Sequence, residues 1–324
     1  MNKKNSKNMN RPELYGMVYE PTYSGATTFL RRTASRDLNG VDLAITGIPL
    51  DTATTNRPGA RFGPRAVRLA STIMAWEKPY GLDFNPVDRL AMVDYGDCHF
   101  DFGKPEAAVN EMIDHISSII DQGPGVLTIG GDHFVSYPVL KAYAKKYKEP
   151  ISLIHFDAHT DTWEAGEGQD PEEENGRIDH GTMFYHAVKE GIVDPKNSVQ
   201  IGIRTENPDT MGFNILDAPW VHKNGIEQVI QKTLEIVGNK PVYMTFDIDC
   251  LDPSFAPGTG TPVCGGLTSH QAMSIIRGLS GINLIGMDVV EVAPAYDVGE
   301  ITALAAAHIA MEMVSIYASK PEFK

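Results

Sequence analysis

The stretch Ile151-Ser-Leu-Ile-His-Phe-Asp157-Ala-His159-Thr-Asp161 decides the fold. Its apolar first half is typical of a buried strand, and its second half places Asp, His and Asp at alternate positions. Alternate side chains of an extended backbone point to the same side, so the three polar side chains converge if the chain stays extended past Asp157. Two carboxylates and an imidazole at a strand end indicate either a metal site or an acid–base site.

Apolar runs alternate with amphipathic segments along almost the whole chain. We expect strands at residues 43–48, 90–93, 126–129, 151–156, 199–203, 242–246 and 284–290, and helices after Pro64 and at residues 106–120, 137–147, 226–237, 268–279 and 301–317. This pattern predicts an α/β fold with a parallel sheet covered by helices on both faces, a three-layer αβα sandwich. No linker divides the chain, so we expect an N-terminal arm, residues 1–35, and one catalytic domain, residues 36–324.

The bulk composition is that of a globular protein, with 42% hydrophobic and 22% charged residues. The formal net charge of −14 argues against nucleic acid as the main partner and suits a small cationic substrate. The N-terminal segment lacks the apolar core of a signal peptide, and no apolar run approaches the ~20 residues that cross a bilayer. The three cysteines form no CxxC pair. We therefore expect a cytoplasmic protein with no membrane association.

Further metal-binding residue types follow three other predicted strands. His133 follows residues 126–129, Asp247 and Asp249 follow residues 242–246, and Glu291 follows residues 284–290. The carboxyl ends of parallel strands meet at one edge of a sheet, which is where such sheets bind ligands. These strand ends therefore predict one shared site.

The predicted cluster needs cations. Four aspartates near one point do not all ionise without positive charge between them, and two divalent ions would cancel their formal charge. The oxygen-rich, thiol-free set favours Mn²⁺, with Ni²⁺ or Co²⁺ as possible substitutes. His155 lies deeper in its strand, so we expect it to be a buried, hydrogen-bonded residue and not a ligand.

Three motifs resemble the signatures of the ureohydrolase family, which includes arginase, agmatinase, guanidinobutyrase, proclavaminate amidinohydrolase and formiminoglutamase. They are Gly130-Gly-Asp-His133, Asp157-Ala-His-Thr-Asp161 and the long segment at residues 246–262. Residues 61–65 and 288–294 also resemble family segments, and the likeness spans about residues 40–315. The family's fold, which deacetylases share, is the same αβα sandwich. The resemblance implies a homotrimer or homohexamer.

The resemblance also implies roles for individual residues. One Mn²⁺ would be held by His133, Asp157, Asp161 and Asp247, and a second by Asp157, His159, Asp247 and Asp249, with Asp157 and Asp247 bridging. A hydroxide formed between the metals would attack the carbon of a guanidino group and release urea and an amine. His180 would protonate the leaving amine, Glu291 would orient the guanidinium, and Asp161 would also contact the intermediate.

Within the family, residues 179–184, 199–205 and 300–306 resemble the bacterial agmatinase subgroup. Arginases place an Asn two positions after the last Asp of the DAHxD motif, whereas this chain has Trp163. The resemblance therefore implies agmatine as substrate and putrescine and urea as products, with 4-guanidinobutyrate as the alternative. The acidic loop at residues 163–177 is longer than the subgroup's pattern, so it leaves the substrate choice open.

Two other classes of protein remain possible. A single-metal deacetylase would use one Asp–His–Asp zinc site, and here His133, Asp161 and Asp249 provide ligands for a second metal. An inactive homologue that binds polyamines or a partner protein would be expected to have lost ligands, and this chain keeps all six.

Overall fold

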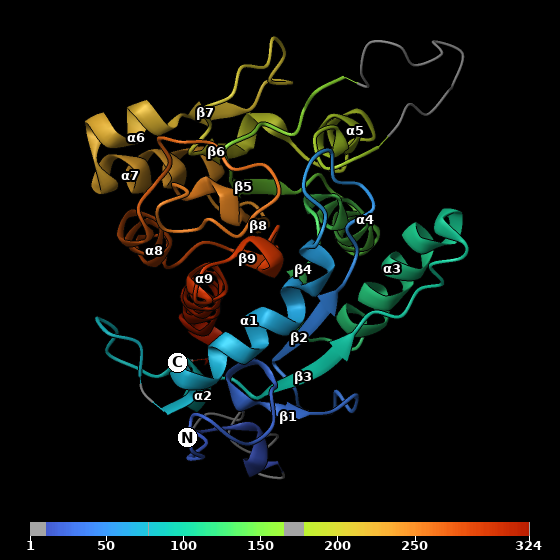
Figure 1. Ribbon diagram of the computed structural model, residues 1–324, viewed down its shortest axis with the longest axis vertical. Helices are drawn as coiled ribbons and strands as arrows, with labels where there is room; N and C mark the ends of the chain where they lie inside the picture. The colour runs from blue at the N-terminus through green and yellow to red at the C-terminus, as the bar shows by residue number, and fades with distance from the viewer. Residues whose placement is uncertain (1–10, 77, 165–177, 324) are drawn as a thin grey trace.

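The computed structural model describes residues 11–76, 78–164 and 178–323 and confirms the three-layer α/β fold (Figure 1). Within these residues the strands form one parallel sheet in the order β1-β3-β2-β4-β9-β8-β5-β6-β7. Their bounds are β1 Thr33–Ala34, β2 Leu43–Ile48, β3 Met92–Asp97, β4 Gly125–Gly130, β5 Ser152–Phe156, β6 Val199–Ile201, β7 Asn214–Leu216, β8 Val242–Asp247 and β9 Leu284–Val290.

Helices cover both faces of the sheet. One layer contains α3 (Pro105–Ile120), α4 (Ser136–Tyr147) and α5 (Met183–Lys189). The other contains α1 (Gly63–Ser71), α6 (Ala218–Asn224), α7 (Ile226–Val237), α8 (Ser269–Gly278) and α9 (Ile301–Ala318), with the short α2 (Pro86–Arg89) beside α9.

The alternation of side chains along each strand divides the core into two. On β5, Leu153 packs into the cluster under α3, α4 and α5, whereas Ile154 and Phe156 pack into the cluster under α1, α7, α8 and α9. All three side chains are fully buried. A strand that is buried on both faces needs a continuous apolar run, and this is why residues 151–156 could be predicted without a polar alternation.

Most predicted elements are confirmed, with small differences at their ends. β3 begins two residues later than expected and continues to Asp97. Arg68 explains the extension, because its guanidinium lies 2.8 Å from the carboxylate of Asp94 and 2.6 Å from that of Asp97, so both charges are compensated within the strand. Thr268 caps α8 in a reciprocal capping box with Gln271.

Part of the expected N-terminal arm contacts the domain. β1 pairs with β3, and Phe29 and Leu30 are fully buried in the core. The first ten residues and most of the acidic loop, residues 165–177, lie outside the described residues. The division of the chain at residue 35 stays a prediction.

Among the described residues, one helix, α9, is long and apolar enough by length and composition alone to cross a membrane, with a mean hydropathy of 1.5 over 18 residues. However, 78% of this segment is buried inside the protein, as expected for a core helix. Its apolar character is explained by packing against α1, α8 and β9.

The sheet order brings the site together. β4 and β5 follow each other in the sequence but are not neighbours in the sheet. β9 and β8, which come later in the sequence, lie between them. The four central neighbours β4, β9, β8 and β5 are therefore the strands followed by His133, Glu291, Asp249 and Asp157. A topological switch point of this kind opens a crevice at the carboxyl ends of the strands.

Candidate metal centre and active site

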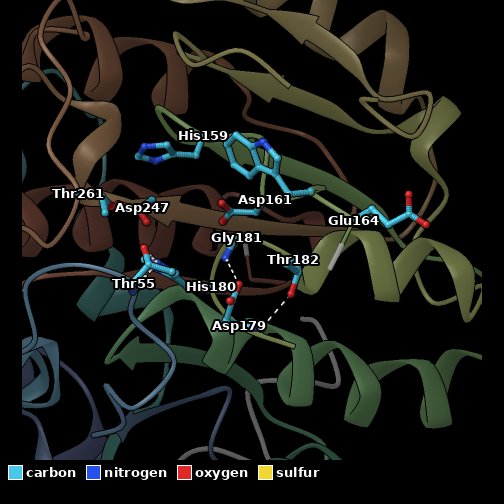
Figure 2. Close-up of a pocket in the computed structure, with 11 residues that line it drawn as sticks. Thr55, His159, Asp161, Glu164, Asp179, His180, Gly181, Thr182, Asp247 and Thr261 are labelled. Atoms are coloured by element: carbon cyan, nitrogen blue, oxygen red, sulfur yellow. Dashed lines mark hydrogen bonds between the residues drawn. The ribbon is translucent and has the colours of Figure 1, made fainter. Parts of the chain in front are cut away.

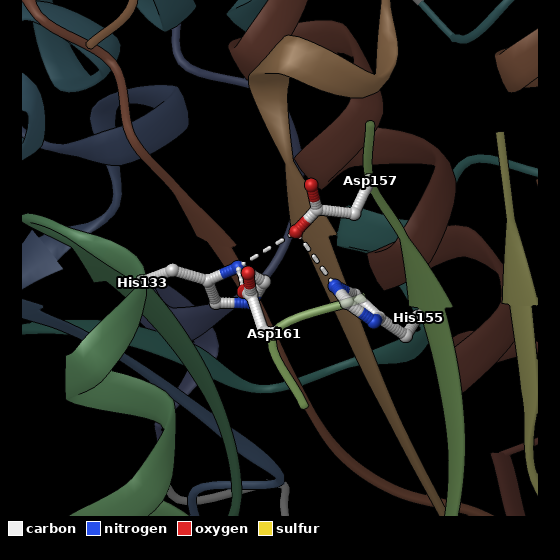
Figure 3. Close-up of side chains that lie close together, drawn as sticks. All are labelled: His133, His155, Asp157 and Asp161. Atoms are coloured by element: carbon white, nitrogen blue, oxygen red, sulfur yellow. Dashed lines mark hydrogen bonds and ion pairs between the residues drawn. The ribbon is translucent and has the colours of Figure 1, made fainter. Parts of the chain in front are cut away.

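A buried group of one nitrogen and three carboxylate oxygens forms at this switch point. His133 Nδ1 lies 3.0 Å from Asp157 Oδ2, 3.0 Å from Asp161 Oδ2 and 3.3 Å from Asp247 Oδ2. Figure 3 shows His133, Asp157 and Asp161 turned toward one another. All four side chains are buried. The sequence predicted these residues as ligands of one metal ion, and the structure brings them together.

The tautomer of His133 is set by its other nitrogen. Nε2 lies 2.8 Å from Thr245 Oγ1, and Thr245 donates its only hydroxyl hydrogen to Asp288 Oδ1 at 2.5 Å. Nε2 must therefore carry the hydrogen, which leaves the lone pair of Nδ1 facing the carboxylates. Four electron-rich atoms that face one point are the donor set of a cation site.

The electrostatics also call for a cation. Burial lowers the pKa of His133, but hydrogen bonds to Asp157, Asp161 and Asp247 outweigh burial and raise the pKa well above its ordinary value. Burial raises the pKa of Asp247 well above its ordinary value, and the charges of Asp249 and Asp157 raise it further. A divalent ion among these oxygens would supply the missing positive charge, so the residues present fit a metal.

A second group lies beside the first. His159 Nδ1 is 3.3 Å from Asp157 Oδ1 and 3.2 Å from Asp249 Oδ2. Asp157 thus presents one oxygen to each group, the geometry that a bridging carboxylate requires. Asp247 presents Oδ2 to His133, while its Oδ1 accepts a hydrogen bond of 2.8 Å from the Asp249 N–H. Its predicted role as a second bridge stays a prediction.

His155 is close enough to the first group to be taken for a ligand. Its Nε2 lies 2.7 Å from Asp157 Oδ2. Its Nδ1 lies 3.0 Å from Gln200 Nε2, which also donates to the Thr160 carbonyl at 2.7 Å. Because Gln200 presents its NH₂ group there, Nδ1 accepts and Nε2–H donates to Asp157. As expected from the sequence, His155 is a buried hydrogen-bonding partner of Asp157, and its exclusion from the ligands stays a prediction.

The backbone reaches this geometry in a different way from the one predicted. The chain does not stay extended after Phe156, and Asp161 adopts a left-handed conformation with φ of 53°. The bend is held by hydrogen bonds from Ala158 N to Asp249 Oδ1 and from Phe184 N to the Asp161 carbonyl. A left-handed non-glycine residue costs of order 1–3 kcal/mol and is typical of functional sites. The three side chains converge because of this bend.

His180 and Glu291 form a pair next to the first group. His180 Nδ1 lies 2.9 Å from Glu291 Oε1, which also accepts from the backbone N–H of His133 at 2.9 Å. Glu291, with φ of 64°, is the second strained residue of the site. Its Oε2 is buried and has no hydrogen-bond partner within the protein. An unpartnered buried carboxylate oxygen is free to accept a hydrogen bond from a ligand or a water molecule.

His180 is engaged at both ring nitrogens. Its Nε2 accepts from the Thr55 N–H at 3.0 Å and lies 2.8 Å from Thr55 Oγ1. Burial lowers its pKa, but the hydrogen bond to Glu291 and the charges of Glu291 and Asp161 outweigh burial and raise the pKa to about 9. The Thr55 N–H contact is that of a neutral ring, whereas a pKa of about 9 favours a second proton on Nε2 near neutral pH.

A pocket of about 390 Å³ opens onto these groups (Figure 2). Metal-group residues, the catalytic candidate His180 and the aromatic Trp163 all contribute to its wall. The lining residues are Thr55, His159, Asp161, Trp163, Glu164, Asp179, His180, Gly181, Thr182, Asp247 and Thr261. Its wall carries several carboxylates, which suits a cationic ligand.

Sequence reasoning did not identify Thr55, Thr245, Gln200 or Asp288 as parts of the site. Thr245 shares the parity of Asp247 on its strand, so alternation could have placed it behind the metal group. Asp288 lies inside a segment already noted for its family likeness. Thr55 and Gln200 gave no such signal, because their roles depend on loops and neighbouring strands that meet only in the folded chain.

Several known proteins resemble this chain in sequence and in structure. An agmatinase from Chromobacterium violaceum is 56% identical over 310 residues, which cover 96% of this chain and 94% of that protein. A hypothetical agmatinase from Burkholderia thailandensis superposes with a TM-score of 0.90 at 54% identity and covers 96% of both chains. Proclavaminate amidino hydrolase from Streptomyces clavuligerus superposes with a TM-score of 0.84 at 36% identity, over 93% of this chain and 99% of that one.

The match to a family profile extends over most of the domain. The profile described as the Arginase family matches residues 41–315, which include every candidate ligand, His180 and Glu291. The fold, together with the buried His and Asp groups, implies a divalent metal in this pocket. By sequence and by structure, the chain belongs to the arginase family.

Proposed function

We propose that this enzyme hydrolyses agmatine to putrescine and urea with two Mn²⁺ ions per chain, and that Ni²⁺ or Co²⁺ can substitute. The observation that carries the proposal is the identity of 51–56% with proteins named agmatinase over 87–96% of the chain. The pocket supports it, because the two His–Asp groups share Asp157 as a bridge would.

The metal ligands are proposed from the two groups. One ion would be held by His133, Asp157, Asp161 and Asp247, and the other by Asp157, His159, Asp247 and Asp249. When bound, the two ions would lower the pKa of a coordinated water toward neutrality and so supply a hydroxide at physiological pH. A single-metal deacetylase is disfavoured, because the family profile and the second group both point to the arginase family.

The protein's own residues would bind and orient the substrate. The free Oε2 of Glu291 can accept a hydrogen bond from the guanidinium and pair with its charge. Asp161, beside His133, faces the same pocket and can accept another hydrogen bond from the guanidino group. His180 would supply the proton that the leaving amine takes up when its bond to the guanidino carbon breaks.

The pocket favours a substrate with a cationic far end. Trp163 occupies the position where arginases have an Asn, and its ring lies beside His159 with centroids 6.2 Å apart. Glu164 follows at the pocket wall. An aromatic face and a carboxylate attract an ammonium group and disfavour the carboxylate of 4-guanidinobutyrate. Arg177, which would favour that carboxylate, lies outside the described residues.

The test is a comparison of urea release by the manganese-loaded protein from agmatine, 4-guanidinobutyrate and arginine. We expect kcat/KM to be highest for agmatine. A preference for 4-guanidinobutyrate would replace the proposed substrate and keep the chemistry. Urea release from none of the three would favour the inactive-homologue alternative.

Three further properties belong to the same proposal. We place the enzyme in the cytoplasm, and we assign its product putrescine to polyamine biosynthesis and agmatine catabolism. We also expect a homotrimer or homohexamer, which sedimentation analysis of the purified protein would test.

A further inference from the structure

The position of His180 raises the question of which atom delivers its proton. Nδ1 faces Glu291 Oε1 at 2.9 Å, so that nitrogen is already engaged by a buried carboxylate. Nε2 faces Thr55. A proton that leaves His180 from Nε2 therefore meets the Thr55 hydroxyl first.

Thr55 is placed to pass a proton onward. Its side chain lies in the wall of the 390 Å³ pocket together with Asp161 and Asp247. Figure 2 shows Thr55 beside His180, with its hydroxyl directed toward the side of the pocket where Asp247 lies. The residue is exposed to the pocket, so a substrate can reach its hydroxyl group. A threonine hydroxyl can accept one hydrogen bond while it donates another.

The loop that carries Thr55 is fastened to the site at several points. Ala53 N donates to Asp132 Oδ2 at 2.8 Å, and the Ala53 carbonyl accepts from His180 N at 3.3 Å. Asn56 Nδ2 donates to the Gly260 carbonyl at 2.9 Å. The loop thus holds the Thr55 hydroxyl at a fixed position against the His180 ring, as efficient proton transfer requires.

We propose that Thr55 is a catalytic residue that relays a proton from His180 to the leaving amine. The inference rests on the proposed function. As the C–N bond breaks, its electron pair stays on the amine nitrogen, which takes the hydroxyl proton from Thr55 Oγ1. At the same time Oγ1 takes the Nε2 proton from His180. His180 ends neutral with its remaining hydrogen on Nδ1, and water in the open pocket returns the second proton.

The observed hydrogen bonds match the end of this transfer. The Thr55 N–H donates to the Nε2 lone pair at 3.0 Å, which is possible only after Nε2 has lost its proton. The hydrogen bond from Nδ1–H to Glu291 Oε1 stabilises the doubly protonated ring, so the ring can take this proton up again. The Thr55 N–H thus donates to Nε2 when Nε2 has no proton, and the Thr55 hydroxyl can accept from Nε2 when it carries one.

The rival role for Thr55 is to orient the His180 ring without passing a proton. The two roles differ in their dependence on the leaving group. A guanidinooxy analogue of agmatine releases an aminooxy nitrogen, which is much less basic than an alkyl amine and leaves with little help from an acid. If Thr55 relays a proton, removal of its hydroxyl group should lower kcat less for this analogue than for agmatine. If Thr55 only orients His180, the loss of kcat should be the same for both substrates.

The experiment compares the manganese-loaded wild type with Thr55→Val, Thr55→Ser and Thr52→Val on both substrates. Thr55→Val keeps the shape and the backbone N–H and removes only the hydroxyl. We expect kcat on agmatine to fall on the order of 100-fold with KM within about twofold, and the loss to shrink to less than about tenfold on the analogue. Thr55→Ser should restore most of kcat. Thr52→Val, at an exposed position of the same loop outside this pocket, should behave as wild type.

Equal losses on the two substrates, or no loss in Thr55→Val, would overturn the relay. Metal content and melting temperature of each variant separate these outcomes from misfolding. A wild type that cleaves 4-guanidinobutyrate in place of agmatine would overturn only the proposed substrate, and the comparison would be made on that compound and its guanidinooxy counterpart. A wild type that cleaves none would overturn both proposals.

Discussion

At the scale of single residues, the position of one hydrogen decides whether a histidine can bind a metal. Thr245 donates its hydroxyl hydrogen to Asp288, so Nε2 of His133 carries the ring hydrogen and Nδ1 keeps its lone pair. Asp288 Oδ2 in turn accepts from Ser136 Oγ at 2.7 Å and from Tyr243 OH at 2.8 Å. The fully buried carboxylate of Asp288 thus fixes the direction of every hydrogen bond behind His133.

Asp288→Asn should therefore weaken metal binding. The Asn carbonyl would face the two donors Ser136 and Tyr243, so its NH₂ group would face Thr245. Thr245 would then donate to Nε2 and move the hydrogen of His133 to Nδ1. We expect the Mn²⁺ dissociation constant to rise about 10–100-fold, measured by metal titration. Ser136→Ala is the control, because it leaves the direction of these bonds unchanged. An unaltered constant in Asp288→Asn would show that the tautomer is set elsewhere.

Glu291→Gln should separate substrate binding from metal binding. Both donors at Oε1, His133 N and His180 Nδ1–H, would hold the Gln carbonyl, so its NH₂ group would replace Oε2 and repel a guanidinium. A charge-assisted hydrogen bond contributes about 1.5–3 kcal/mol, so we expect kcat/KM for agmatine to fall about 10–150-fold. Metal content should stay unchanged. Steady-state kinetics and metal analysis on the same preparation test both statements, and wild-type kcat/KM would exclude the ion pair.

At the scale of elements, the strands that carry the site were predictable and the pieces between them were not. β2, β9 and α7 match their predicted bounds, because fully buried runs and a strong helical period leave no alternative. β7 was missed because three residues show no period, and the seven-residue α5 and α6 were missed for the same reason. The candidate ligands could be collected from strand ends, but the bend at Asp161 and the loop of Thr55 arise from long-range contacts.

Arg204 is an example of a residue that holds loops through long-range contacts, which no periodic pattern in the sequence predicts. Its guanidinium donates to the carbonyls of Asp249 at 2.6 Å and Val263 at 2.7 Å, and also to Gly202, Cys250 and Leu251. Because a lysine ammonium lacks the planar fork, Arg204→Lys should lower the free energy of unfolding by about 1–3 kcal/mol and reduce metal content. Denaturant titration measures the first effect. Arg36→Lys, which loses one exposed bond to the Asp97 carbonyl, is the control and should change stability by less than about 0.5 kcal/mol. Equal effects in the two variants would contradict the role of Arg204.

His115 on α3 should make the stability of this layer depend on pH. Its Nε2 lies 2.7 Å from Thr46 Oγ1 on β2, and burial, followed by the charge of Arg36, lowers its pKa to about 4. Between the pKa of ~6.5 in the unfolded chain and the pKa of about 4 in the folded chain, His115 binds a proton only in the unfolded chain. This contribution to stability is therefore complete above about pH 6.5 and is lost as the pH falls toward 4.

The variant His115→Gln measures this contribution, because it keeps an N–H donor and removes the titration. The difference in unfolding free energy between wild type and His115→Gln should be constant above about pH 6.5 and should turn against the wild type between about pH 6.5 and 4. His270→Gln, at an exposed position on α8, is the matched comparison. A pH-independent difference for His115→Gln would show that the imidazole has the same pKa in the folded and the unfolded chain.

At the scale of the whole molecule, the candidate metal site lies between two halves of the sheet, which β9 and β8 separate. One half consists of β1, β3, β2 and β4, and His133 follows β4. The other half consists of β5, β6 and β7, and Asp157 and Asp161 follow β5. β8 and β9 lie between them and contribute Asp247 and Glu291. Without cations, burial raises the pKa values of Asp247 and Asp249, and the charge of Asp157 raises both of them further. Metal ions at the junction should therefore stabilise the whole fold and not only a loop.

Removal of the metal tests this directly. A ligand present at 100 times its dissociation constant stabilises the folded state by about 2.7 kcal/mol, so chelation should lower the melting temperature by roughly 5 °C, and added Mn²⁺ should restore it. Asp157→Ala, which lacks the carboxylate shared by both groups, should melt at the same temperature with and without chelator. Glu227→Ala, at an exposed position on α7, should keep the full response. Calorimetry should show one transition that moves as a whole, because the proposed ligands that follow β4, β5 and β8 would bind the same ions. A split transition, or a chelator response that survives Asp157→Ala, would mean that the metal stabilises only part of the sheet.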